Sequence, residues 1–195
     1  TGEHRKLFVP ENCKTVIVMA VQMDYDSMRS SPDILAGAAT GFGYSKMAFL
    51  TFQVSQFLRH LGYTAIPNGN DTALSIPLAI KAGLGELGRN GLLITKKYGP
   101  RVRICKVITD MELPCDSQDS FGVEAFCKIC KKCVKACPSR SIPLGDKTEV
   151  GPSKISSFSG KKKWYINPES CYEFWRKNMI DCSNCIRPIL NSLKI

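Results

Sequence analysis

Long apolar runs are missing from this sequence of 195 residues. Because no stretch reaches 18 apolar residues, the sequence excludes a membrane-spanning helix within its own length. The start also lacks the basic and apolar pattern of a secretion signal. The first residue is Thr1 rather than Met, and we expect a fragment of a longer protein. The apolar share of 44% is ordinary for a folded core, and the length suits one domain with a small appendix.

Cysteine, in contrast, is abundant, with ten residues in all. Four of them form a run that ends in a proline and reads C-x2-C-x2-C-x3-C-P: Cys127, Cys130, Cys133, Cys137 and Pro138. In ferredoxins with this spacing, three thiolates hold one [4Fe–4S] cluster and the fourth ligates a second. Structural zinc sites usually use two separated C-x2-C pairs. Disulfides fit so short a run poorly, because several pairs would need bridge geometry at once. The run therefore indicates iron–sulfur chemistry.

A second cysteine group supplies three more thiols, Cys171, Cys182 and Cys185. Two clusters with exchanged ligands need eight thiolates, and these two groups offer seven. The eighth is expected four residues after Cys185, where the chain has Ile189. We therefore expect Cys137 to complete the second cluster and Ile189 to deprive the first of its fourth ligand. This leaves a three-iron cluster, a substitute ligand such as water or another thiol, or, as we favour, a sequence that diverges from its functional parent near Pro188. The remaining three cysteines are interpreted as packing or surface thiols: Cys13, Cys105 and Cys115.

The net charge of +10 indicates an anionic partner or surface. Lysines lie among the cluster ligands at Lys128, Lys131, Lys132 and Lys135. These lysines could bind an acidic electron donor. Such a donor explains the positive charge at least as well as nucleic acid does. The run at residues 161–163 is read as a solvated loop.

Apolar periodicity predicts alternating strands and helices in the first part of the chain. The expected strands are residues 15–23, 63–67, 92–95 and 104–109, and the expected helices are residues 46–61 and 72–82. Residues 40–45 are expected to form a turn, and Gly62 to end the first helix. This alternation indicates an α/β layer. From Phe121 onward no long periodic segment is expected. We divide the chain into a core, residues 1–120, and an iron–sulfur region, residues 121–195, joined by a linker near residues 113–122.

Residues 83–88 match G-x-G-x-x-G, but they follow a predicted helix and precede a strand. A dinucleotide fingerprint requires the opposite order, so the glycines indicate a close approach or a positive φ. Residues 82–95, then 99–103, then the cysteine run resemble the respiratory reductive dehalogenases, above all their chloroethene-reducing branch. Epoxyqueuosine reductases have a related pattern. The resemblance extends over residues 15–185.

The resemblance implies a fold of mixed α+β and α/β character. A nitroreductase-like corrinoid-binding core would precede a ferredoxin-like region with two [4Fe–4S] clusters. It implies a base-off cobalamin without histidine on cobalt, which suits a chain with only His4 and His60 and no D-x-H-x-x-G motif. It also implies export to the periplasmic face of the membrane and association with a small membrane-anchor protein. A respiratory electron donor, an organohalide substrate and a homodimer are expected, and nucleic acid is not.

The implied reaction is R–Cl + 2e⁻ + H⁺ → R–H + Cl⁻. In this family a tyrosine gives the proton and an arginine stabilises the phenolate, which points to Tyr44 and Arg103, with Asn70 orienting the substrate or phenol. Residues expected near the cofactor are Thr40, Lys46, Gly83, Gly85 and Gly88. Without the resemblance, Tyr44 reads as a half-buried aromatic at a helix start and Asn70 as a turn residue. Five aromatic residues could wall an apolar pocket or belong to the core: Phe42, Phe49, Trp164, Tyr172 and Trp175.

Two other functions remain open from the sequence. An epoxyqueuosine reductase would use the same cofactors on a tRNA base, and the positive charge would suit RNA. That family has an aspartate proton donor, whereas residues 40–46 contain Tyr44 and no acid. A ferredoxin-type electron-transfer module is the second alternative, but it would leave residues 1–120 without a purpose. Corrinoid content distinguishes the module from the enzymes, and turnover of a chloroethene or a tRNA distinguishes the enzymes from each other.

Overall fold

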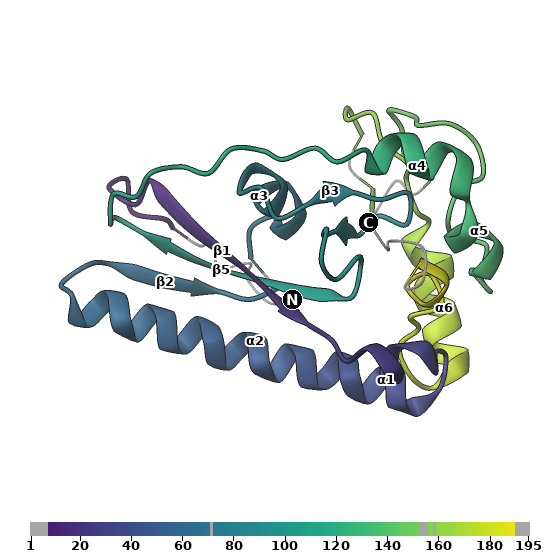
Figure 1. Ribbon diagram of the computed structural model, residues 1–195, viewed down its shortest axis with the longest axis horizontal. Helices are drawn as coiled ribbons and strands as arrows, with labels where there is room; N and C mark the ends of the chain where they lie inside the picture. The colour runs from purple at the N-terminus through teal and green to yellow at the C-terminus, as the bar shows by residue number, and fades with distance from the viewer. Residues whose placement is uncertain (1–7, 71, 153–155, 158, 190–195) are drawn as a thin grey trace, which may run out of the picture.

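The computed structural model describes residues 8–70, 72–152, 156–157 and 159–189 of the chain. Its centre is a three-stranded sheet in the order β1-β5-β2 (Figure 1), formed by β1 (Thr15–Gln22), β5 (Val102–Thr109) and β2 (Ala65–Asn68). Both strand pairs are antiparallel, with Thr109 opposite Thr15 on one side and Ala65 on the other. The predicted strands are present. Because the strands pair antiparallel, the sheet is of the α+β kind and not of the α/β kind, whereas both kinds are expected from the sequence.

Helices cover both faces of the sheet. The long helix α2 (Ile34–His60) runs along one face, and α3 (Ser75–Lys81) lies on the other (Figure 1). Ile17 and Met19 of β1 pack toward α2, whereas Val18 and Ala20 pack toward α3. Successive side chains of a strand point to opposite faces, so β1 is apolar without interruption because both of its faces are covered. A short hairpin, β3 (Glu86–Leu87) and β4 (Leu93–Ile94), frames the glycine-rich loop.

The turn predicted at residues 40–45 is wrong, because α2 passes straight through it. The helix begins after Asp33, whose carboxylate accepts a hydrogen bond from the Ile34 amide at 2.7 Å. Glycines weaken a helix locally, but Gly43 faces the sheet, and a Cβ there would lie 3.2 Å from side-chain carbons of Arg103 and Met23. Tertiary packing therefore explains this glycine. The predicted helix, residues 46–61, is the second half of α2, and Gly62 follows with a φ of +90°.

After β5, the described residues form three α-helices. They are α4 (Val123–Cys130), α5 (Lys132–Ala136) and α6 (Pro168–Asn178), followed by the 3-10 turn η1 (Arg187–Ile189). The expectation of no long periodic segment is wrong for α6, which starts with an Asn167 cap and Pro168. Residues 112–121 contain no helix or strand, as expected of a linker, but the Glu86 carboxylate accepts a hydrogen bond from the Phe121 amide at 2.6 Å. The proposed domain boundary stays a prediction.

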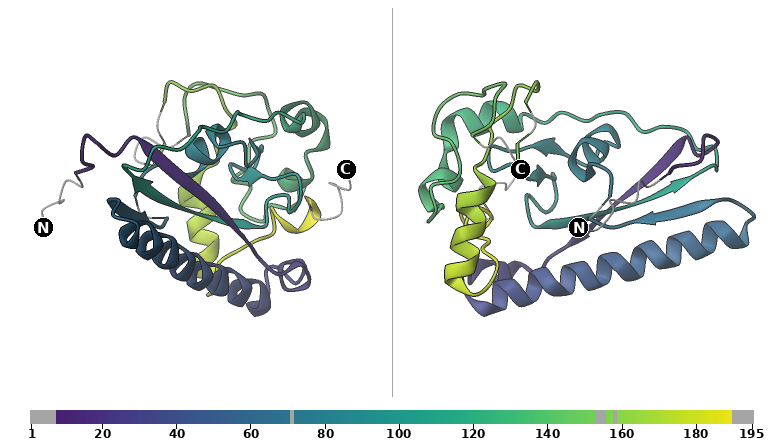
Figure 2. Two further views of the ribbon diagram at one scale, coloured as in Figure 1. Left: turned by 60° about the vertical axis from the view of Figure 1, so that its left-hand side comes forward. Right: turned by 180° about the vertical axis from the view of Figure 1, so that it is seen from behind.

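The corner between α1 (Tyr25–Arg29) and α2 joins the sheet region to the second cysteine group. The buried Ser31 hydroxyl accepts a hydrogen bond from the Ser183 amide and donates one to the Asn184 side chain, both at 2.9 Å. The Ser31 carbonyl accepts a third from Arg187 at 2.7 Å. In both views of Figure 2, α6 lies beside α1 and the start of α2. Among the helices of the described residues, none combines the length and apolar character needed to cross a membrane.

Candidate functional site

The first three cysteines of the run line one cavity of about 140 Å³. Cys127 and Cys130 lie on α4 and Cys133 on α5, and Lys131 turns the chain between the helices with a φ of +51°. Ile189 lines the same cavity, on η1. An apolar cavity of about 150 Å³ admits a molecule as large as benzene. Three thiols and one isoleucine therefore surround a volume that could take a compact cluster.

The other four cysteines lie within electrostatic reach of one another. Burial raises the pKa of Cys171, and the neighbouring Cys137 and Cys182 raise it further. The pKa of Cys185 is also raised by burial first, and then by Cys182, Cys171, Cys133 and Cys137. The fourth cysteine of the run thus lies with the second group, as ligand exchange between two clusters requires. The assignment of individual ligands stays a prediction.

The protonation state of these thiols also bears on whether iron fits them. Burial, and then the charges of Cys127 and Cys130, raise the pKa of Cys133 to about 11. Without iron this thiol is protonated at neutral pH, and ligation must displace the proton. Among the described residues no three His, Cys, Asp or Glu side chains converge on one metal ion. A cube distributes its ligands over separate irons, so its thiolates surround a volume instead. The donor set and its arrangement fit an iron–sulfur cluster.

Arg89 connects the glycine-rich loop to the first cysteine group through hydrogen bonds. This residue was not identified from the sequence. It is 1% exposed. Its Nε donates to the Cys127 carbonyl at 3.0 Å, and its Nη1 donates to the carbonyls of Pro143 at 2.9 Å and Gly145 at 2.7 Å. Its backbone amide donates to the Cys127 sulfur at 3.5 Å. An arginine inside a glycine-rich loop is the one signal that could have indicated this role.

Two neighbours of Arg89 extend the same connection. Asn90 donates to the carbonyl of Cys185 at 3.4 Å, so the loop contacts both cysteine groups. The guanidinium of Arg89 lies 4.3 Å from the centre of the Trp164 ring, and Trp164 donates to the Gly145 carbonyl at 3.2 Å. Trp164 is buried. The sequence predicts that Trp164 either walls an apolar pocket or belongs to the core, and the structure places it in the core.

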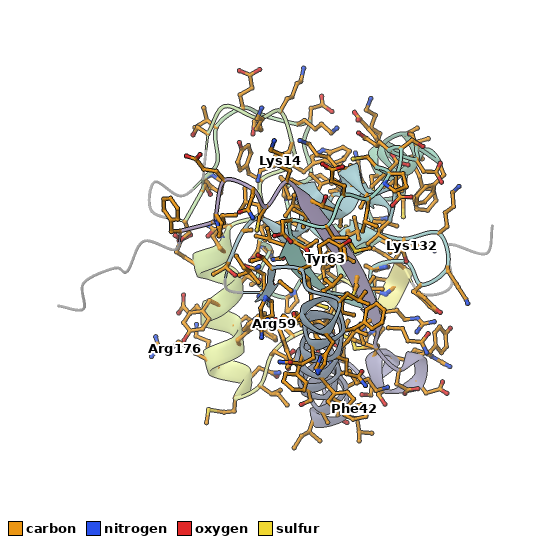
Figure 3. The ribbon with its side chains drawn as sticks, turned by 90° about the vertical axis from the view of Figure 1, so that its left-hand side faces the viewer. Lys14, Phe42, Arg59, Tyr63, Lys132 and Arg176 are labelled. Carbon is orange, nitrogen blue, oxygen red and sulfur yellow. The ribbon has the colours of Figure 1, made fainter. Side chains whose placement is uncertain are left out.

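Arg89→Met should lower the free energy of unfolding by several kcal/mol. The substitution removes the guanidinium donor from the part-buried carbonyls of Cys127 and Pro143, and each buried group left unpaired costs about 1–3 kcal/mol. Urea denaturation of the anaerobic, cluster-loaded chain measures the change. Arg176→Met is the matched control, because Arg176 lies exposed on α6, on the opposite side of the molecule from Lys132 (Figure 3). It should change stability by less than about 0.5 kcal/mol. Equal effects of the two substitutions would contradict the role given to Arg89.

The glycines of the loop pack closely against other residues of this chain. Gly83 has a φ of +70°, and a Cβ there would lie 2.6 Å from the Ser117 carbonyl oxygen. A Cβ on Gly85 would overlap the carbonyl of Ile94, and one on Gly88 would lie 2.9 Å from its side chain. The predicted close approach is thus explained by packing within the described residues. Contact of these glycines with a cofactor stays a prediction.

Tyr44 and Arg103 lie together although 59 positions separate them in the sequence. Tyr44 lies on α2 and is 37% exposed. The guanidinium carbon of Arg103, on β5, lies 4.6 Å from the centre of its ring, which is cation–π range. Among the described residues, the buried Nε of Arg103 has no hydrogen-bond partner. A partly open phenol thus faces a fixed positive charge that has an unused donor.

Among the described residues, no side-chain hydrogen bond or ring contact joins the other predicted site residues to this pair. Thr40 is buried, with its hydroxyl 3.9 Å from the Met23 sulfur. Lys46 is exposed and lies over the Phe42 ring at 4.4 Å. Asn70 is exposed beyond β2, and within the described residues no hydrogen bond or ring contact joins it to Tyr44 or Arg103. The proposed roles of these three residues stay predictions.

Comparison with known proteins gives a consistent result. The family described as "4Fe-4S dicluster domain" matches residues 126–187. A tetrachloroethene reductive dehalogenase of Desulfitobacterium hafniense is 47% identical over 176 residues, which cover 89% of this chain and 32% of the relative. Over most of its length this chain is therefore similar to the reductive dehalogenases. A relative with the same name in Sulfurospirillum multivorans is 39% identical over 93% of this chain and 36% of its own length. The chain spans about a third of the length of these curated relatives.

Solved structures agree with this similarity. A catabolic reductive dehalogenase superposes with a TM-score of 0.76 at 28% identity, covering 87% of this chain and 24% of its own. An epoxyqueuosine reductase of Lactococcus garvieae is 30% identical over 72% of this chain and 38% of its own length. A solved epoxyqueuosine reductase with a tRNA stem loop has a TM-score of 0.62 at 16% identity, over 94% of this chain and 50% of its own. That likeness shows a shared fold alone.

Proposed function

We propose that this chain is part of a corrinoid-dependent reductive dehalogenase that removes chloride from a chlorinated ethene. The observation that carries the proposal is the contact between Arg103 and Tyr44, in a chain 47% identical to a tetrachloroethene reductive dehalogenase. The reaction R–Cl + 2e⁻ + H⁺ → R–H + Cl⁻ needs a proton donor, a source of single electrons and a low-potential metal centre. This chain offers the first two.

The proton comes from Tyr44 in this proposal. A cation beside a phenol favours the phenolate that remains after proton transfer, and Arg103 retains its charge throughout the working pH range. The partial exposure of Tyr44 leaves the phenol accessible to a substrate. The unpaired Nε of Arg103 gives the guanidinium an additional donor for the developing anion. Asn70, two residues beyond β2, would orient the substrate at the edge of this site.

The cofactor would lie against the same face. One solved relative is a reductive dehalogenase described in connection with "B12-dependent dehalogenation". When bound, a corrinoid supplies a low-potential cobalt that takes up single electrons and reduces the carbon–halogen bond. The exposed Tyr44 and the unpaired Arg103 nitrogen fit a site completed by such a group. We propose that it binds base-off, without protein histidine, near Thr40, Lys46, Gly83, Gly85 and Gly88.

Two [4Fe–4S] clusters would deliver the electrons, one at each cysteine group, with Cys137 exchanged between them. An acidic respiratory donor would approach over α4 and α5, where Lys128, Lys132 and Lys135 are exposed. Figure 3 shows Lys132 at the outer edge of the molecule. By family resemblance we also propose a periplasmic location, a small membrane-anchor protein and a homodimer.

Arg103→Lys should lower turnover of the full-length protein by about tenfold, within the roughly 0.5–2 kcal/mol of a cation–π contact. A compact ammonium keeps the charge but cannot reproduce the planar guanidinium over the ring. Steady-state chloride release measures the effect, and Arg176→Lys on the exposed face of α6 serves as the control. Unchanged turnover in Arg103→Lys would show that Arg103 does not act on Tyr44.

A direct comparison of substrates tests the function itself. The full-length protein, with clusters, corrinoid and a chemical reductant, is given tetrachloroethene or a tRNA containing epoxyqueuosine. We expect chloride release and no tRNA reduction. The absence of a carboxylate from residues 40–46 argues against the second substrate. Reduction of the tRNA without chloride release would establish the alternative enzyme. Electron transfer with neither reaction would establish a ferredoxin-type module.

A further inference from the structure

A chain of serine hydroxyls begins at the Cys137 sulfur. The Ser139 hydroxyl lies 3.4 Å from this sulfur, and the backbone amide of Ser141 donates to it at 3.3 Å. The hydroxyls of Ser139 and Ser141 are 2.6 Å apart, and those of Ser141 and Ser170 are 2.8 Å apart. We refer to these three residues as the serine chain. It joins the end of the cysteine run to a segment about 30 residues later.

Local backbone geometry explains how the serine chain forms. Arg140 has a φ of +51°, a left-handed conformation that is uncommon for a residue other than glycine. This conformation turns the loop so that the serines on either side of Arg140 both reach the sulfur. At the other end, the Asn167 amide donates to the Ser141 carbonyl at 2.8 Å, and the Asn167 side chain caps α6 at Ser170. Ser141 is 4% exposed, so water does not compete freely for its bonds.

The serine chain connects two ligands of the same expected cluster. Ser170 directly precedes Cys171, and Cys171 lies within electrostatic reach of Cys137. The first cysteine group has a different environment: the Cys127 sulfur accepts a bond from the Arg89 amide. Among the described residues, no side-chain hydroxyl bonds to the sulfur of Cys127, Cys130 or Cys133. The two groups therefore differ in the polar contacts around their sulfurs.

Ligation to iron fixes the direction of every bond in the serine chain. A thiolate bound to iron has no proton and can only accept. Ser139 must then donate to Cys137, which leaves the Ser139 oxygen to accept from Ser141. Ser141 in turn accepts from Ser170, whose hydroxyl favours this contact at 2.8 Å over the Asn167 carbonyl at 3.3 Å. Successive bonds that point the same way polarise one another. All these donors therefore direct positive charge toward the sulfur.

We propose that the serine chain raises the reduction potential of the cluster held by Cys137, Cys171, Cys182 and Cys185. Reduction adds one negative charge to a cluster, and donors directed at its sulfurs stabilise the reduced form more than the oxidised form. The inference rests on the proposed iron–sulfur function. It makes Ser139, Ser141 and Ser170 positioning residues for electron transfer, because they act through a ligand and not on the substrate.

An EPR-monitored redox titration of the anaerobically reconstituted chain tests the proposal. Ser139→Ala should lower the midpoint potential of one cluster by about 59 mV, which is a tenfold change in a one-electron equilibrium. Ser170→Ala should shift the same signal in the same direction but by less, because it removes only the far donor. Ser139→Thr retains the hydroxyl and should keep the wild-type potential. Ser45→Ala, on the exposed side of α2, should change nothing.

The outcomes separate this proposal from the others. Unchanged midpoints in both Ser139→Ala and Ser170→Ala would overturn it. If Ser139→Ala loses iron, its midpoint potential cannot be compared, and the test then depends on Ser170→Ala and Ser139→Thr. In that case a wild-type midpoint potential in Ser170→Ala would overturn the proposal. The titration needs neither corrinoid nor organohalide. A shifted midpoint in a protein that releases no chloride would refute only the proposed dehalogenase function. Failure of the unmodified chain to take up iron would overturn both proposals.

Discussion

Tyr44→Phe should lower chloride release by the full-length protein by about 100- to 10,000-fold, the usual cost of losing a positioned general acid. The substitution removes only the hydroxyl, so the ring remains beneath the Arg103 guanidinium, 4.6 Å from its carbon. Iron content should stay at the wild-type value because no cysteine contact changes, and cobalt content should stay because the ring itself is retained. Steady-state kinetics with tetrachloroethene measure the loss, and metal analysis excludes loss of a cofactor as its cause.

Tyr63→Phe is a matched control for this experiment. Tyr63 is 39% exposed, against 37% for Tyr44. It lies just before β2, and Figure 3 labels it. Its loss should leave turnover unchanged. If Tyr44→Phe retained near-normal activity, the proton would have to come from another group, and the role given to the Tyr44–Arg103 pair would be wrong.

Ile189→Cys should complete the first cluster. Ile189 is 8% exposed and lines the cavity that contains Cys127, Cys130 and Cys133. An isoleucine cannot ligate iron, so the unmodified chain should hold one stable [4Fe–4S] cluster and one labile or three-iron cluster. A cysteine at this position supplies the eighth thiolate, and iron content should rise toward about eight per chain. Iron analysis and EPR after anaerobic reconstitution measure the change.

Ile142→Cys tests whether position rather than thiol number matters. Ile142 is buried in the same hydrophobic cluster as Cys133 and Ile189 but does not line the cavity. It should therefore add no stable iron. If the unmodified chain already contained eight irons and gave only [4Fe–4S] signals after reduction, the ligand assignment would be wrong, and another group would have to complete the first cluster.

Much of the fold could be predicted because strands and metal ligands leave local signals. The apolar run at β1 and the spacing of the seven cysteines both indicate their structures within short windows. The turn predicted at residues 40–45 failed for the opposite reason. Glycine indicates a break when only neighbours are considered, whereas Gly43 is explained by Arg103, which approaches α2 from a strand 60 positions later.

The site could be predicted only in part. The pairing of Tyr44 with Arg103 followed from a family resemblance, and the structure brings the two side chains together. Arg89 carries only a weak local signal, its place in a glycine-rich loop, because its partners are backbone carbonyls 38 to 56 residues away. The contact from Ser139 to Ser170 depends on where α6 lies, and no local pattern specifies that. Long-range polar contacts of this kind become visible only in three dimensions.

The cobalt content of the full-length protein tests the proposed corrinoid chemistry most directly. The protein should be purified anaerobically from cells supplied with corrinoid, and its cobalt measured by elemental analysis beside its iron. We predict about one cobalt per chain, held as extractable corrinoid. Protein that contains its iron–sulfur clusters but no cobalt would contradict a corrinoid-dependent dehalogenase and would favour an electron-transfer module.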